Sequence, residues 1–300
     1  MGFFELNGAP IVLDGGLATE LEARGHDLSG PLWSARLLME APQEIVAAHL
    51  AFFRAGAQIA TTASYQASFA GFRAHGVDQG DAVRLLRRSV ELAKVARDQM
   101  PDQHRARWVA ASAGPYGAAL ADGSEYRGRY GLSVRELTAF HRPRLEVLAA
   151  AEPDLLALET VPDADEGAAL VAAVAGLGVP AWLSYTISGT RTRAGQPLAE
   201  AFTVAANDDT IVAVGVNCCS PADVPRAIAT ARQVTGKPVI AYPNSGEGWD
   251  AQRRAWTGPA RFSPLLAQQW SAEGARIIGG CCRVSPADIT ALSRTLAGAG

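Results

Sequence analysis

Short apolar runs rich in β-branched residues alternate, along the whole chain, with longer segments whose apolar residues follow a helical period. The runs predict strands, and the segments rich in Ala, Leu, Arg and Glu predict amphipathic helices. The expected strands are Ile11–Asp14, Ile59–Thr62, Trp108–Ser112, Leu155–Glu159, Ala181–Thr186, Ile211–Asn217, Val239–Tyr242 and Arg276–Gly279. The expected helices, several of which open with Pro or Asp, are Gln43–Ala55, Asp81–Gln99, Val134–Ala150, Asp163–Ala175, Pro197–Ala205, Ala222–Val234, Pro259–Ala272 and Pro286–Leu296.

Eight strand–helix units in a chain of 300 residues predict an α/β fold of the (β/α)₈ (TIM) barrel type. A doubly wound open sheet is the alternative fold. The chain contains no Ser/Gly-rich tract, charge block or low-complexity segment that would act as a linker. We therefore expect one domain spanning residues 1–300.

Composition excludes several classes of partner. The chain is 48% hydrophobic and 19% charged, with a net charge of −3, and it lacks the basic surplus of proteins that bind nucleic acid. Neither a signal peptide nor an apolar run of ~18 residues is present, so we expect no membrane association and a cytoplasmic protein. Thiols are kept reduced in the cytoplasm, which favours metal binding or catalysis over disulfides for the cysteines.

Polar residues follow the expected strands, and active sites of (β/α)₈ barrels lie where the strands end. The candidate substrate-binding residues are Asp14, Gly15, Tyr65, Glu159, Asn217 and Asn244. Glu159 is the most informative, because a glutamate that ends an apolar strand needs a partner such as a ligand amine or an internal arginine. Four of the others also have a structural explanation. Asp14 could shape a turn, Tyr65 could pack in the core, and Asn217 and Asn244 could bond loop backbone.

All four cysteines follow two of the expected strands, as Cys218-Cys219 and Cys281-Cys282. Thiolates suit Zn²⁺, and three protein ligands leave one coordination position open for a substrate. Neighbouring residues of a strand point to opposite faces, but Gly279-Gly280 allows the chain to leave strand geometry. We expect Cys218, Cys281 and Cys282 to bind zinc, with Cys219 as the odd thiol. No histidine lies at a strand end, so none is included.

Six segments together resemble the homocysteine S-methyltransferases, over about residues 10–295. They are Leu13–Gly16, Thr62–Ser68, Leu158–Thr160, Gly215–Cys218, Tyr242–Glu247 and Gly279–Cys282. The resemblance implies a (β/α)₈ enzyme that binds one Zn²⁺ through Cys218, Cys281 and Cys282. It also implies that Asp14 and Glu159 hold the amino acid part of homocysteine.

Within that family, the Thr62–Ser68 and Tyr242–Glu247 segments resemble the branch that uses S-methylmethionine or S-adenosylmethionine more than the betaine-using branch. The expected reaction is methyl transfer from a sulfonium donor to the homocysteine thiol, forming methionine. The metal activates the thiol, so no side chain is expected to act as a general base. The chain ends at Gly300 without the C-terminal extension through which betaine enzymes oligomerise, so we expect a monomer.

Three long strand–helix connections, 114–131, 187–196 and 244–258, are candidate lids or binding loops. Trp249 and Trp256 could contact the sulfonium through cation–π attraction or simply pack the loop. Loop arginines could bind a donor carboxylate, although such residues are usually solvated. These are Arg127, Arg129, Arg191 and Arg193.

Other functions stay open. A non-catalytic zinc barrel would close its metal site with a fourth protein ligand such as Cys219. An aldolase-like lyase is possible on the same fold, but no strand ends in the lysine that its Schiff-base form needs. The acceptor could also be a related selenol such as selenocysteine, and the preferred sulfonium donor is not distinguished.

Overall fold

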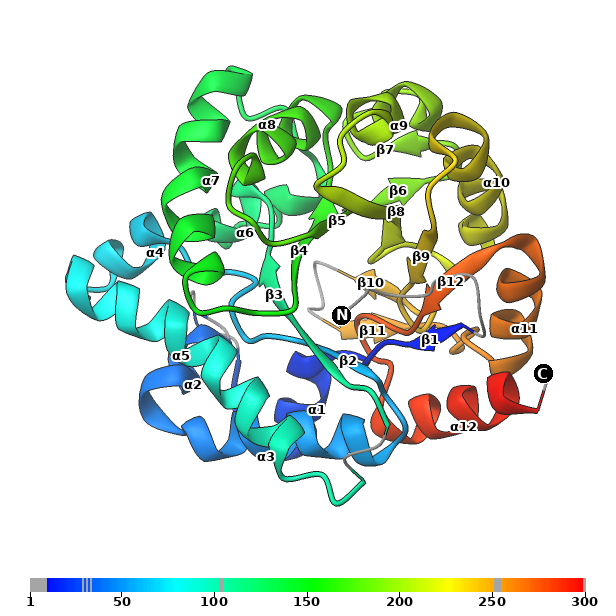
Figure 1. Cartoon of the computed structure of the whole chain (residues 1–300), viewed down its shortest axis with the longest axis horizontal. Helices are drawn as coiled ribbons and strands as arrows, with labels where there is room; N and C mark the ends of the chain where they lie inside the picture. Colours follow the sequence, from blue (N-terminus) through cyan, green and yellow to red (C-terminus); the bar gives the residue numbers. More distant parts are fainter. Residues whose placement is uncertain are drawn as a thin grey trace.

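The computed structural model describes residues 10–28, 30, 32, 34–102, 105–250 and 255–298. Eight parallel strands form one sheet in the order β1-β12-β9-β8-β5-β4-β3-β2. Figure 1 shows these strands at the centre of the molecule with helices around them. Their bounds are β1 Ile11–Val12, β2 Ile59–Thr61, β3 Trp108–Ala113, β4 Leu155–Val161, β5 Ala181–Tyr185, β8 Ile211–Asn217, β9 Val239–Tyr242 and β12 Ala275–Ile278.

The two ends of this sheet meet. Leu13 forms a parallel bridge with Ile59. The amide of Asp14 donates to the Ile59 carbonyl at 3.1 Å, and the amide of Gln58 donates to the Val12 carbonyl at 2.7 Å. These bonds join β1 to β2 and close the barrel. The predicted (β/α)₈ fold is therefore confirmed, and the open sheet is wrong.

The predicted helices are present with shifts at their ends. They are α3 Pro42–Arg54, α5 Gln79–Asp98, α7 Val134–Ala149, α8 Ala164–Val174, α9 Leu198–Ala206, α10 Val224–Thr235, α11 Pro264–Glu273 and α12 Pro286–Ala297. The expected start of α11 at Pro259 is wrong. The amides of Arg261 and Phe262 both donate to the Ser245 carbonyl, at 2.6 and 2.7 Å, which holds this segment extended until Ser263.

Several short elements were not predicted, since they are too short to show a clear hydrophobic period. They are α1 Leu17–Ala23, α2 Ser34–Glu40, α4 Phe69–Ala74, α6 Tyr116–Leu120 and two 3₁₀ turns, η1 Ser124–Tyr126 and η2 Pro221–Asp223. The 114–131 connection contains α6 and η1, and the 187–196 connection is a hairpin of β6 Ile187–Ser188 and β7 Arg191–Thr192.

The 244–258 connection contains a second hairpin, of β10 Gly248–Asp250 and β11 Ala255–Thr257. Trp249 and Trp256 are paired in its register. Their side chains, and residues 251–254 altogether, lie outside the described part of the chain, so the cation–π hypothesis stays a prediction.

The strands bury both faces, as parallel strands under helices do. Side chains such as Ile11, Leu155, Trp182 and Ile240 fill the barrel interior, while a larger apolar cluster packs between strands and helices. Gly215 is required for this packing, since a Cβ there would lie 1.8 Å from the Ile240 carbonyl oxygen. None of the helices within the described ranges is long and apolar enough to cross a membrane.

Candidate metal and substrate site

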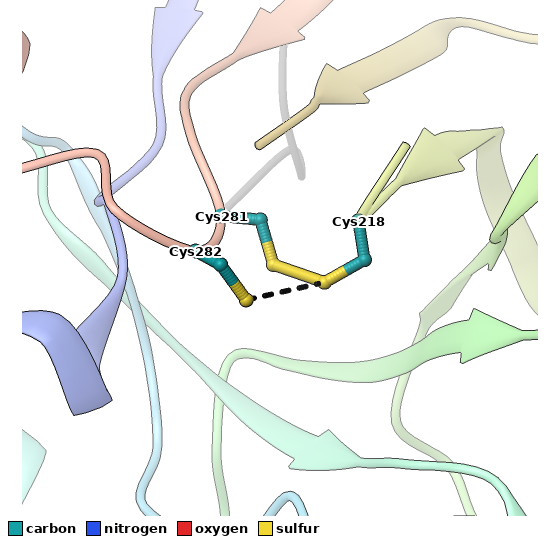
Figure 2. Close-up of side chains that lie close together, drawn as sticks. All are labelled: Cys218, Cys281 and Cys282. Carbon is teal, nitrogen blue, oxygen red and sulfur yellow. Dashed lines mark hydrogen bonds between the residues drawn. A yellow bond between two sulfur atoms is a disulfide. The ribbon is translucent and has the colours of Figure 1, made fainter. Parts of the chain in front are cut away.

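The sulfur atoms of Cys218, Cys281 and Cys282 lie within 4.8 Å of one another. Cys218 follows β8, and Cys281 and Cys282 follow β12. In the sheet, β9 lies between these two strands. Figure 2 shows the three side chains pointing toward a common point from these two chain segments. This is the one group of three or more metal-ligating residues found among the described residues. The sequence prediction that these cysteines come together is confirmed.

Backbone bends present the sulfurs. Cys218 has a left-handed φ of +47°, which turns its side chain away from the direction that β8 would give it. Gly279 and Gly280 then carry the chain past β1. A Cβ at Gly279 would lie 2.6 Å from the Asp14 carbonyl oxygen, and one at Gly280 would lie 2.3 Å from Val284 Cγ1. The glycines are therefore needed for close approach, as well as for leaving strand geometry.

Hydrogen bonds hold both cysteine segments. The Cys281 amide donates to the Pro243 carbonyl at 2.8 Å, and the Cys282 amide donates to Asn244 Oδ1 at 3.1 Å. On the other side, the Thr186 hydroxyl donates to the Cys218 carbonyl at 3.0 Å. Neighbouring strands thus fix the positions from which the three sulfurs converge.

Two of the sulfurs, those of Cys218 and Cys281, are joined as a disulfide (Figure 2). The third sulfur, of Cys282, is 3.9 Å from that of Cys218. The sequence argument favoured metal binding over disulfides and did not predict this bond. It follows from proximity, because sulfurs placed to share one ion are also close enough to oxidise. A disulfide and a metal site are alternative states of the same cysteines, since only thiolates bind zinc.

Cys219 lies outside this group. Its side chain is 1% exposed and belongs to the apolar cluster between strands and helices. Burial raises the pKa of its thiol to about 12, and burial raises that of Cys282 to about 11. Cys219 is thus not part of the group of three sulfurs, and its predicted role as the odd thiol stays a prediction. The alternative of a metal site closed by Cys219 has no support in this geometry.

Two buried carboxylates lie deeper in the barrel mouth. Asp14 accepts hydrogen bonds from the Thr61 amide at 2.7 Å and the Thr61 hydroxyl at 3.1 Å. Burial raises the pKa of Asp14 well above its usual range; the Thr61 bonds oppose this shift, and the charge of Glu159 adds to it. A bound cation beside Asp14 would stabilise its ionised form.

Glu159 accepts a short hydrogen bond from the Ser112 hydroxyl. Burial raises its pKa, and hydrogen bonds from Ser112 and Tyr242 lower it. Among the described residues, no basic side chain forms an ion pair with Glu159 or contributes to this shift. The internal arginine that the sequence left open is thus not found, and a ligand amine remains the suitable partner.

The two asparagines hold the site together. Asn217 Oδ1 accepts from the Thr160 amide at 2.7 Å and the Ser184 hydroxyl at 2.8 Å, while Asn217 Nδ2 donates to the Thr160 hydroxyl at 2.7 Å. Asn244 binds the Cys282 amide, as noted. Both residues satisfy backbone or neighbouring side chains, the second of the two roles considered from the sequence.

The family model for homocysteine S-methyltransferase matches residues 11–296. The chain belongs to this family. The homocysteine S-methyltransferase of Escherichia coli is 46% identical over 94% of this chain and 94% of its own length, and YbgG of Bacillus subtilis, a homocysteine S-methyltransferase, is 43% identical over 93% and 92%. We conclude that this protein is an enzyme of the homocysteine S-methyltransferase family.

Solved structures agree with this assignment. The E. coli homocysteine methyltransferase MmuM in its metallated form has a TM-score of 0.86 and 43% identity, covering 96% of both chains. Its oxidized form also has a TM-score of 0.86, with 45% identity and 95% coverage of both chains. A family member with the same barrel has thus been solved both with metal and in an oxidized state.

The remaining predicted residues are Gly15 and Tyr65. A Cβ at Gly15 would lie 2.4 Å from the Val284 carbonyl oxygen, so this glycine lets the loop after β12 pack against β1. The Tyr65 ring packs on Gly114, and burial raises the pKa of its hydroxyl well above its usual range, while an interaction with the Thr160 hydroxyl lowers it. Tyr65 is half-buried, and its hydroxyl interacts with Thr160, the residue after Glu159.

Sequence reasoning missed Tyr126, Glu125 and Ser112. The hydroxyl of Tyr126 interacts with the Cys282 thiol, and the Arg193 guanidinium lies over the Tyr126 ring, 5.8 Å from its centroid. Glu125 and Tyr126 belong to η1, inside the 114–131 connection that was noted only as a long loop. Ser112 ends the expected strand Trp108–Ser112, so the polar residues at strand ends could have included it. Nothing in the spacing of Glu125 and Tyr126 relates them to the cysteines.

Proposed function

We propose that this protein transfers a methyl group from a sulfonium donor, S-methylmethionine or S-adenosylmethionine, to the thiol of L-homocysteine, with one zinc ion held by Cys218, Cys281 and Cys282. The products are methionine and the demethylated donor. The observation that carries this proposal is the convergence of three sulfurs within 4.8 Å at the carboxyl end of a barrel of this family.

The donor set fits zinc. With Zn–S bonds of about 2.3 Å, tetrahedral geometry separates two sulfur ligands by roughly 3.8 Å. The distance of 3.9 Å between the Cys218 and Cys282 sulfurs agrees with this value. Cys281 would join the set once its disulfide to Cys218 is reduced. Three protein thiolates leave a position for a fourth ligand, and bound zinc would supply a homocysteine thiolate at neutral pH in place of a thiol of pKa ~8.5.

The side chains of the barrel then orient the acceptor. Asp14 and Glu159 are suited to bind the homocysteine ammonium group, since both are buried and neither has a cationic partner among the ion pairs described. Ser112 and Thr61 fix the two carboxylates by hydrogen bonds. Holding the ammonium group of homocysteine fixes the position of its sulfur in the site. Alignment of that sulfur with the methyl group is the main requirement of an in-line displacement.

The transfer itself needs no proton. The acceptor sulfur donates an electron pair to the donor's methyl carbon, and the bond from that carbon to the sulfonium sulfur breaks. The sulfonium sulfur keeps the bonding pair and leaves as a neutral thioether. No acid is required for this leaving group. None of the described residues named above for the site is a histidine. The residues that line the mouth, including Tyr65 and Tyr126, would exclude water from the reacting atoms.

The test is methionine formation by the reduced, zinc-bound protein. Homocysteine is supplied with S-methylmethionine, S-adenosylmethionine or betaine in separate reactions. We expect turnover with a sulfonium donor and none with betaine. Turnover with betaine alone would contradict the assigned donor class, and zinc binding without turnover with any donor would favour a non-catalytic barrel or another acceptor, such as a selenol.

Cysteine variants test the metal site separately. Cys282→Ser should lose bound zinc and activity, because serine is a poor zinc ligand at neutral pH. Cys219→Ser is the matched control, since it changes a neighbouring thiol that lies outside the group of three. Loss of zinc from the control but not from Cys282→Ser would show that the ligands are wrongly assigned.

A further inference from the structure

Glu125, in η1 of the 114–131 connection, has a buried carboxylate with one unpartnered oxygen. Its side chain belongs to a residue that is only 4% exposed. Its Oε2 atom has no hydrogen-bond partner within the described part of the chain. A carboxylate removed from water without a hydrogen bond is costly, so such a group is usually kept for a ligand.

No basic side chain of the described residues contributes to the electrostatics of this carboxylate. Burial raises the pKa of Glu125; its own backbone amide lowers it, and the charge of Asp122 raises it further. Basic side chains do not contribute, although several arginines lie elsewhere on the rim loops. Glu125 thus resembles Asp14 and Glu159 in lacking a positive partner, but it is contributed by a different loop.

The surroundings of Glu125 are those of the cysteine site. Glu125 belongs to η1, and η1 contacts β4, the strand that carries Glu159. The next residue, Tyr126, interacts directly with Cys282. A Cβ at Gly117 would lie 2.4 Å from the Glu125 amide nitrogen, so α6 packs tightly against this turn and holds it in place.

The chemistry around Glu125 indicates its ligand. The bare carboxylate oxygen requires a hydrogen-bond donor that is also a cation. The charge of Glu125 also raises the pKa values of the Tyr65, Tyr126 and Tyr130 hydroxyls, so aromatic residues lie around this carboxylate. Both sulfonium donors carry an α-ammonium group with N–H bonds. Betaine carries a quaternary ammonium without any N–H bond and could not satisfy this oxygen.

We infer that Glu125 binds the α-ammonium group of the sulfonium methyl donor, opposite a homocysteine held by Asp14 and Glu159. This inference rests on the function proposed above. Arg193, which lies over the Tyr126 ring, provides a positive charge for the donor's carboxylate. Recognition of the amino acid end of the donor would then distinguish a methionine-derived sulfonium from other methylated cations.

The experiment compares Glu125→Gln with wild-type enzyme in steady-state kinetics with S-methylmethionine and homocysteine. Glutamine keeps the size of the side chain but removes the charge. We expect the KM for S-methylmethionine to rise about 10- to 100-fold, the effect of losing a hydrogen bond to a charged group. The KM for homocysteine should stay unchanged. Asp122→Asn is the matched control, because Asp122 is exposed in the same loop and an asparagine can still accept from the Ser124 amide.

The outcomes separate this inference from the proposed function. If wild-type enzyme turns over and Glu125→Gln has an unchanged KM for the donor, the inference is wrong and the function stands. A rise confined to the KM for homocysteine would assign Glu125 to the acceptor and also overturn it. If no sulfonium donor supports turnover by wild-type enzyme, both fail. Should Glu125→Gln not fold, Glu125→Asp, which withdraws the charge by one methylene, should raise the donor KM.

Discussion

Replacing Asn217 with alanine should destabilise the barrel, because Asn217 ties three strands together below the cysteines. Its side chain makes three hydrogen bonds, to the Thr160 amide, the Thr160 hydroxyl and the Ser184 hydroxyl. All partners are buried, with Thr160 1% exposed and Ser184 fully buried. Thr160 also has a left-handed φ of +58°, a conformation that these bonds help to hold.

The magnitude follows from the partners left behind. A buried amide without an acceptor costs about 1–3 kcal/mol, and each hydroxyl that loses a bond costs about 0.5–1.5 kcal/mol. The Ser184 hydroxyl can turn to Tyr242, with which it already interacts, so its share is small. We therefore expect Asn217→Ala to lower the free energy of unfolding by roughly 2–5 kcal/mol.

Urea denaturation followed by circular dichroism measures this change as a shift of the unfolding midpoint. Asn207→Ala is the control, since Asn207 is exposed at the end of α9 and should give a change within about 0.5 kcal/mol. A variant at Asn217 that is as stable as wild type, but has a raised KM for homocysteine, would refute this reasoning. Asn217 would then be a ligand-binding residue, as the sequence first suggested.

Three further changes probe other parts of the structure. Glu159→Gln should raise the KM for homocysteine about 10- to 100-fold in steady-state kinetics, with no loss of stability, because a buried amide costs less than a buried carboxylate; an unchanged KM would remove Glu159 from the substrate site. His49 is fully buried with no hydrogen-bond partner among the described residues, and burial lowers its pKa to about 4 from 6.5. Its unfolded form binds a proton first, so stability is lost as pH falls from 6.5 to about 4, and urea midpoints of His49→Leu should fall less over this range than those of wild type. Gly215→Ala should not yield folded protein in a solubility and circular dichroism assay, since its Cβ would meet the Ile240 carbonyl oxygen at 1.8 Å, whereas Gly30→Ala, with open space around it, should fold normally.

The sequence predicted the barrel well because its strands are buried on both faces and read as continuous apolar runs. It predicted the ends of elements less well where tertiary bonds decide them, as at Ser245, whose carbonyl holds the segment before α11 extended. Short helices such as α6 escaped prediction because five residues cannot show an amphipathic period.

The site was predictable where its residues are chemically distinctive. Cys281 and Cys282 follow two glycines at a strand end, and a barrel brings every strand end to one mouth. The roles of the polar residues were less certain, because a sequence does not show which partner satisfies an amide or a carboxylate. Asn217 satisfies Thr160 and Ser184, while Glu125, in a loop with no evident motif, has an oxygen that nothing described satisfies.

The central claim is that the methyl transfer requires a zinc ion bound by the three cysteines. The most direct test is to add zinc stepwise to the reduced, metal-free protein and to measure methionine formed from homocysteine and S-methylmethionine at each step. We expect activity to be absent without zinc, to rise in proportion to the zinc added, and to level off near one ion per chain. Full activity in the metal-free protein, or zinc bound at one ion per chain without any methionine formed, would contradict the account.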